Sequence, residues 1–173
     1  VAKTDNSGKY SILIPSEERS YFIKVTKNNY IETILYNINQ NNQLIGMYQE
    51  TIVLISNSFT SSTYNTQLVI SDAFNKSYDN SGMMRLDSAS INVRKGINNK
   101  TGEIYASATT DNNGIVYMQL EPGMYTVEIN KVGYAVNYYT ITVVSDNTMI
   151  NVNTTPVLNE GEVRIVLTWN DTP

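Results

Sequence analysis

The chain has 173 residues, of which 41% are hydrophobic and 16% are charged, and its formal net charge is −4. It contains neither cysteine nor histidine, which excludes disulfides, thiolate nucleophiles, histidine-dependent catalysis and zinc sites built from those residues. The basic residues are scattered and no apolar run reaches the roughly 18 to 20 residues that span a bilayer, so we expect no nucleic-acid partner and no membrane insertion.

The N-terminal segment contains a tight-turn sequence and two predicted strands. Asp5 and Gly8 supply a side chain that can bond its own backbone and a glycine free to take a positive φ. Apolar residues alternate with polar ones over residues 10–14 and again over 21–25, and this period of two predicts half-buried strands. A longer turn separates the two segments.

Three further strands are predicted in the middle of the chain, over residues 51–55, 67–70 and 90–94. The stretch between the first and second of these is polar and rich in Ser, Thr and Asn. We interpret residues 57–66 as a linker.

The second half of the chain repeats the landmarks of the first. Residues 110–114 read Thr-Asp-Asn-Asn-Gly, matching Thr-Asp-Asn-Ser-Gly at 4–8, and an alternating segment follows each copy. Next comes a strand opened by Tyr125 or Tyr21, with a lysine and a second tyrosine, Tyr134 or Tyr30, at the same spacing behind it. Alternation predicts that Tyr125, Val127 and Ile129 point inward and that Thr126, Glu128 and Asn130 face water.

The C-terminal part contains three more predicted strands, over residues 140–144, 149–153 and 163–169. Short strands separated by polar turns every ten or so residues are typical of a sandwich or barrel. We therefore predict an all-β protein made of two tandem antiparallel β-sandwich modules of prealbumin-like, or Ig-like, type.

The repeated motif resembles the carboxypeptidase regulatory-like module, a prealbumin-like β-sandwich. Its pattern is Thr-Asp-x-x-Gly, an alternating strand, Pro-Gly-x-Tyr-x-Val and then Gly-Tyr. In the second copy the pattern is carried by Thr110, Asp111, Gly114, Leu120, Pro122, Gly123, Tyr125, Val127, Gly133 and Tyr134. The first copy has Asn29 where the second has Gly133, and Ser88 replaces a glycine that precedes the upstream strand of the family.

The resemblance implies a division into a partial module over residues 1–56, the linker, and a complete module over 67–160. Residues 161–173 form a strand that resembles the opening of a further module. Because few residues precede the first Thr-Asp turn, we expect the first module to be truncated at its N-terminus, with an open edge that can pair with a strand of another chain.

Tyr138, Tyr139 and Trp169 are the candidate ligand-binding residues, because exposed aromatic rings can stack on sugars, whereas the repeated tyrosines are interpreted as core residues. No catalytic, cofactor-binding or metal-binding residues are predicted. The two Asp-containing turns are too short to surround calcium. Some related pilus modules form lysine–asparagine isopeptide bonds with the help of a buried glutamate, but Glu128 is one position away from the place of that glutamate.

These observations predict a non-catalytic module, either a spacer or a domain that presents loops, in a larger bacterial protein that is secreted or lies at the cell surface. Its expected partners are other domains of the same polypeptide, with a glycan or protein ligand as a further possibility. One alternative is a carbohydrate- or protein-binding module. The other is an accessory domain that stabilises a catalytic domain elsewhere in the full chain.

Overall fold

The computed structural model describes residues 1–13, 20–38, 52–58, 62–76 and 82–163. In that part, the chain forms β-strands and no helix, and it therefore contains no helix able to cross a membrane. The strands are β1 (Tyr21–Val25), β2 (Thr33–Ile38), β3 (Tyr64–Lys76), β4 (Met83–Arg85), β5 (Ser90–Lys95), β6 (Ala106–Thr109), β7 (Ile115–Leu120), β8 (Gly123–Asn130), β9 (Asn137–Val143) and β10 (Thr148–Thr154). The all-β prediction is confirmed.

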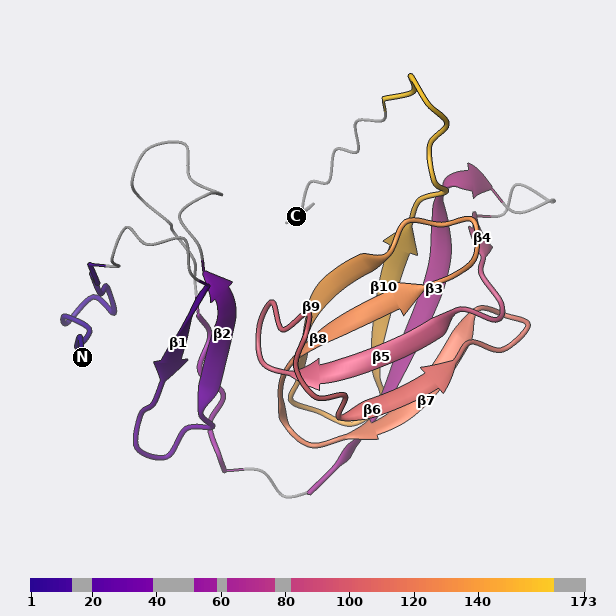
Figure 1. Ribbon diagram of the computed structural model, residues 1–173. Coiled ribbons are helices and arrows are strands. Elements are labelled where there is room, and N and C mark those ends of the chain that lie inside the picture. Colours follow the sequence, from indigo (N-terminus) through magenta and orange to yellow (C-terminus); the bar gives the residue numbers. More distant parts are fainter. Residues whose placement is uncertain (14–19, 39–51, 59–61, 77–81, 164–173) are drawn as a thin grey trace.

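Strands β3 to β10 form a sandwich of two sheets, shown face to face in Figure 1. One sheet has the order β6-β5-β8-β9, and the other has the order β10-β3-β4, with β7 also paired to β3. Besides pairing with β10, the long strand β3 pairs with two strands in succession. Its first half pairs with β7 and its second half with β4. It begins at Tyr64, inside the stretch predicted as linker.

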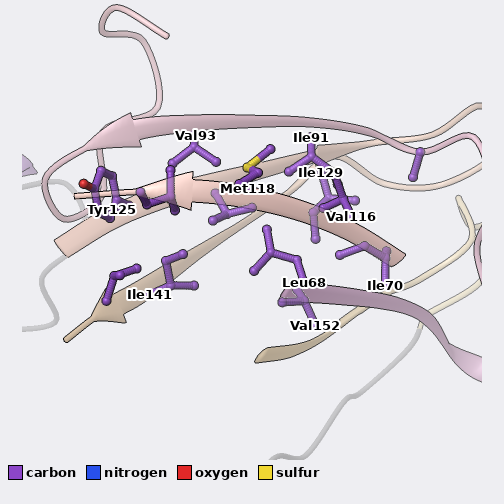
Figure 2. Packing of buried hydrophobic residues seen from close by; sticks show 14 of the residues in the cluster. Leu68, Ile70, Ile91, Val93, Val116, Met118, Tyr125, Ile129, Ile141 and Val152 are labelled. Atoms are coloured by element: carbon purple, nitrogen blue, oxygen red, sulfur yellow. The ribbon is translucent and has the colours of Figure 1, made fainter. Parts of the chain in front are cut away.

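The core lies between these sheets, and strand alternation fills it. Tyr125, Val127 and Ile129 of β8 are almost completely buried, as predicted, and they belong to the same core cluster as Leu68 and Ile70 of β3. Figure 2 shows labelled side chains of this cluster, among them Leu68, Ile70 and Ile129, directed into the space between the sheets. Burying each such side chain is worth about 1.5–3 kcal/mol, so this cluster supplies most of the drive for folding.

The pair β3–β10 is parallel, whereas the other strand pairs of the described residues are antiparallel. Their register runs from Thr66↔Thr148 to Asp72↔Thr154, so the first and last strands of the sandwich lie side by side and point the same way. The sequence pattern did not indicate this, because alternation assigns side chains to faces but carries no strand direction.

Strands β1 and β2 form a separate antiparallel hairpin that is joined to the sandwich by backbone hydrogen bonds. The amide of Tyr36 donates to the Ile97 carbonyl (2.9 Å), and the amide of Ile97 donates to the Ile34 carbonyl (2.8 Å). Leu35 is fully buried and packs with Ile97 in a small second core. We call this contact, formed by residues 34–36 and 96–98, the joint.

The strands predicted over residues 10–14 and 51–55 are not formed by those of their residues that the structure describes. Residues 9–13 lie outside any strand, and Leu13 is 97% exposed. Residues 52–55 also lack a strand ladder, although Ile55 is buried and its carbonyl accepts a hydrogen bond from the amide of Ile31 (2.8 Å). In both places the apolar pattern is present, but no strand of the described residues pairs with it to form a ladder. Most of the strand predicted at 163–169 falls outside the described residues.

Candidate functional site

The candidate site lies on the outer face of the β6-β5-β8-β9 sheet, where two pairs of outward-facing residues meet. Glu128 of β8 is directly opposite Tyr138 of β9, and Thr126 is opposite Thr140. Because neighbouring residues of a strand point to opposite faces, these four side chains form one continuous patch. Their chemistry is a carboxylate, a phenol and two hydroxyls.

The connection between β5 and β6 folds back over this patch. Thr126 was expected to face water, but it is only 1% exposed because this connection covers it. The Thr126 hydroxyl donates to the Gly96 carbonyl (2.8 Å) and accepts a hydrogen bond from the amide of Asn99 (2.8 Å). A threonine on the outer face thus fastens a loop to the sheet, which no strand pattern predicts.

Asn99 and Arg94 hold the covering loop in shape. The Asn99 amide group donates to the Lys95 carbonyl (2.8 Å), and its side-chain oxygen accepts from the amide of Gly102 (2.9 Å). Nε of Arg94 donates to the Gly102 carbonyl (2.9 Å). These bonds satisfy buried polar groups and fix the loop against the sheet.

Glu128 and Arg94 form a largely buried ion pair beneath the loop, with 2.9 Å between Oε2 and Nη1. Nδ2 of Asn92 donates to the other carboxylate oxygen (2.9 Å). Burial acts to raise the pKa of Glu128, but hydrogen bonds from Asn92 and Arg94 outweigh it, and the pKa lies below its usual value. Burial and the neighbouring Glu128 carboxylate raise the pKa of Tyr138. The Glu128 carboxylate is therefore fully engaged in structural contacts.

A half-open pocket of about 330 Å³ lies between the loop and β9. Residues 137–140 of β9 and Thr126 of β8 line it on the sheet side, Val136 lines one end, and Asn98 and Lys100 line it on the loop side. Nζ of Lys100 is 5.2 Å from the centroid of the Tyr138 ring. Within the described part of the chain, Lys100 forms no ion pair with an acidic side chain. The pocket therefore combines an aromatic ring, amides, a hydroxyl and an unpaired ammonium group.

The predicted ligand-binding residues are separated by the structure. Tyr138 is 36% exposed and faces outward. Tyr139 points the other way, packs against the core and donates its hydroxyl to the carbonyl of Asn153, although it also contributes to the pocket lining. Trp169 lies outside the described residues. A ligand-binding role for the three remains a prediction.

Lys100 and Asn98 belong to this pocket but were not predicted from the sequence. They lie on a loop whose course depends on Thr126 and Asn99, and no motif marks those contacts. The available local signal was Gly96 together with the asparagines that follow it, a composition typical of a tight reversal. Gly96 and Asn98 both take positive φ values, 96° and 55°.

The Asp-containing turns direct their carboxylates at the backbone. Oδ1 of Asp111 accepts from the amides of Asn113 (2.9 Å) and Ile115 (2.8 Å), and Oδ1 of Asp5 accepts from those of Ser7 (2.8 Å) and Lys9 (2.9 Å). No group of three or more acidic residues that could hold a metal ion occurs in the described residues.

Comparison with known proteins finds fold-level similarity only. No family model matches the chain, so the carboxypeptidase regulatory-like resemblance stays a prediction, and no curated protein matches it. The Bacillus anthracis TIE protein is similar over 90% of this chain, with 15% identity and a TM-score of 0.43. The shaft pilin spaA from Lactobacillus rhamnosus GG is similar over 91% of this chain and 70% of its own, with 14% identity and a TM-score of 0.40. The chain spans 28% of the length of the TIE protein.

Proposed function

We propose that the chain is a non-catalytic structural segment of a larger secreted or surface-anchored bacterial protein, in which neighbouring modules are held at a set angle. The joint carries this proposal. A flexible linker alone would let the hairpin and the sandwich move independently. Here the two are connected by backbone hydrogen bonds and by the buried pair Leu35 and Ile97, as in a continuous sheet.

Gly96 makes the close approach at the joint possible. A Cβ atom at this position would lie 2.7 Å from the Tyr36 ring and 2.8 Å from the Ile34 carbonyl oxygen, and the residue has a φ of 96°. Both distances are too short for a real Cβ contact. Any side chain at Gly96 must therefore push the hairpin away from the sandwich, which makes the joint testable by a single substitution.

Distance measurements between spin labels test the proposal directly. The chain has no cysteine, so Asn28→Cys on the hairpin and Asn112→Cys on the sandwich provide unique labelling positions at exposed residues. We expect one narrow distance distribution in the parent chain and a broad one after Gly96→Ala.

Gly133→Ala is the matched control, because Gly133 has a φ of 83° but no atom within 4 Å of a new Cβ. It should leave the distribution narrow. A broad distribution in the parent chain itself would contradict a fixed angle between the modules.

A carbohydrate- or protein-binding module is the second candidate function, and the pocket beside Tyr138 favours it. Binding sites for small ligands are concave, with a few polar groups placed around an apolar surface. We expect saturable glycan binding that Tyr138→Ala abolishes on a glycan array. Tyr117→Ala is the control, because Tyr117 is 69% exposed on the opposite sheet. Equal loss in both variants, or binding that survives Tyr138→Ala, would contradict a site at Tyr138.

A further inference from the structure

We infer that the pocket beside Tyr138 binds a saccharide that carries a carboxylate, and that Lys100 is its cationic contact. The inference rests on the second candidate function, because it names the ligand class of that pocket. It follows from the charge, the shape and the pre-formed geometry of the site.

Charge is the first argument. Three other cations of the sandwich already have acidic partners, as Arg94 pairs with Glu128, Lys95 with Glu121 and Lys131 with Asp87. The Arg94–Glu128 pair is neutral as a unit, so the ammonium of Lys100 leaves the pocket with a positive charge on a chain whose net charge is −4. A positively charged concave site favours an anionic ligand, and a carboxylate accepts strong charge-assisted hydrogen bonds from an ammonium group.

The aromatic ring is the second argument. The Lys100 ammonium lies over the Tyr138 ring at an exposed site, where cation–π contacts are weak. A ligand carboxylate can therefore draw the ammonium toward itself, and the ring becomes available to the apolar face of a sugar. Tyr138 lies directly opposite Glu128 in the β8–β9 ladder, so the backbone of β9 keeps its ring at the pocket.

The polar surroundings suit hydroxyl groups. The exposed Thr140 lies two residues from Tyr138 on the same face of β9, and on the loop side Nδ2 of Asn98 donates to the Tyr36 carbonyl (3.2 Å), which holds this amide in place. Groups that are already fixed lose little entropy when a ligand binds. The volume of about 330 Å³ is near the lower limit for ligand pockets, which fits one or two sugar rings rather than a long chain.

A carboxylated sugar can be a sialic acid or a uronic acid, and binding experiments distinguish these sources. We would titrate the intact chain with sialyllactose, with a digalacturonide and with neutral lactose, following the tyrosine and asparagine resonances by NMR. We expect at least one acidic sugar to bind at least tenfold more tightly than lactose. The one that binds more tightly identifies the source.

Two lysine variants test the cationic contact. Lys100→Met should weaken binding of the acidic sugar about tenfold, equivalent to about 1.4 kcal/mol, and leave any lactose binding unchanged. Lys27→Met is the matched control, since Lys27 lies 4.6 Å from the centroid of the Tyr30 ring in the hairpin, away from the pocket. It should have no effect.

The outcomes separate this inference from the function on which it rests. Equal affinity for acidic and neutral sugars, or acidic binding that Lys100→Met leaves intact, would overturn the carboxylate inference while the glycan-binding function stands. If none of the three sugars binds, the carboxylate inference is overturned, and the Tyr138→Ala comparison on the array then decides whether the chain is a binding module at all.

Discussion

The turns at Asp5 and Asp111 are built alike, yet a strand begins directly after the second, whereas residues 9–13 after the first lie in no strand. In each turn, the aspartate carboxylate accepts hydrogen bonds from two backbone amides. A glycine with a positive φ, Gly8 (78°) or Gly114 (69°), completes the turn. The amide of that glycine donates to the aspartate carbonyl at 3.0 or 2.9 Å. Beyond the second turn β7 begins at once, whereas residues 9–13 after the first form no ladder.

The turn is therefore a local structure, whereas the strand depends on a partner distant in sequence. The hydrogen bonds to the aspartate carboxylate and carbonyl that close each turn come from residues within it, so the same sequence folds it in both places. Strand β7 exists because β3 pairs with it from Tyr64↔Leu120 to Val69↔Ile115. Burial follows from pairing, because Val116 is 5% exposed while Ile12, in the matching segment, is 44% exposed.

Amide hydrogen exchange should show the largest contrast. Residues of β7 that bond to β3 should exchange only through unfolding of the sandwich, at least about a thousandfold more slowly than residues 9–13. The measurement is exchange followed by NMR at several protein concentrations. Protection of residues 9–13 that grows with concentration would instead support the predicted pairing of this open edge with another chain.

Replacing each of the two turn glycines with alanine should show how much of the lost stability comes from the strained φ and how much from contacts with the rest of the sandwich. At Gly114 a Cβ would lie 2.7 Å from the Ile70 carbonyl oxygen and 2.9 Å from the Leu86 amide, whereas at Gly8 nothing lies within 4 Å. Gly114→Ala should lower the free energy of unfolding by about 3 kcal/mol or more, the strain of a positive φ plus the clash. Gly8→Ala should leave the urea unfolding of the sandwich unchanged. Similar losses in both variants would show that the clash with β3 is relieved elsewhere.

Tyr134 and Tyr30 occupy matching positions in the two copies, and we expect their substitutions to differ in their effect on stability, by a smaller amount that depends on pH. The Tyr134 hydroxyl donates to Oδ2 of the buried Asp72 (2.9 Å), and Tyr134→Phe should cost about 1.5–3 kcal/mol at pH 7. Burial, together with the bond to Asp72 and its charge, raises the pKa of Tyr134 to about 12. Since the folded state favours the protonated phenol, this stabilisation is complete below the usual value of about 10 and is lost as the pH rises through 12.

Urea unfolding of the parent and of Tyr134→Phe at a series of pH values checks this. The two curves of stability against pH should approach each other between about pH 10 and 12. Tyr30→Phe, at the same landmark of the first copy, should not affect the sandwich. A constant gap across the range would contradict the role of the phenolic proton.

Strand alternation could predict the inner face of the sandwich because it depends on neighbours in sequence. The burial of Tyr125, Val127 and Ile129 could be predicted from this alternation alone. Thr126 could not be placed correctly, since its burial depends on a loop that begins at Gly96, thirty residues earlier in the chain. The same applies to Lys100, which reaches the pocket only because that loop folds over the sheet.

For the candidate tyrosines Tyr138 and Tyr139, the sequence could predict that they face opposite sides of the sheet, but it could not by itself predict which one faces the core. Adjacent residues of one strand face opposite sides, so Tyr138 and Tyr139 could have been separated from the sequence alone. Which of them faces the core depended on the register of β9 with β8, and Ile141 and Val143 give that answer because they are buried on the side of Tyr139. In the same way, Asn29 could be predicted to replace Gly133 at little cost, since both adopt a positive φ and asparagine tolerates it.

The parallel pairing of β3 with β10 has a mechanical consequence. These are the first and last strands of the sandwich, so a pull on the chain entering β3 and the chain leaving β10 acts along the strands in opposite directions. The hydrogen bonds from Thr66↔Thr148 to Asp72↔Thr154 then bear the load together in shear, whereas an antiparallel pair pulled from one end would unzip bond by bond. A sandwich connected in this way yields only when the whole ladder slides at once.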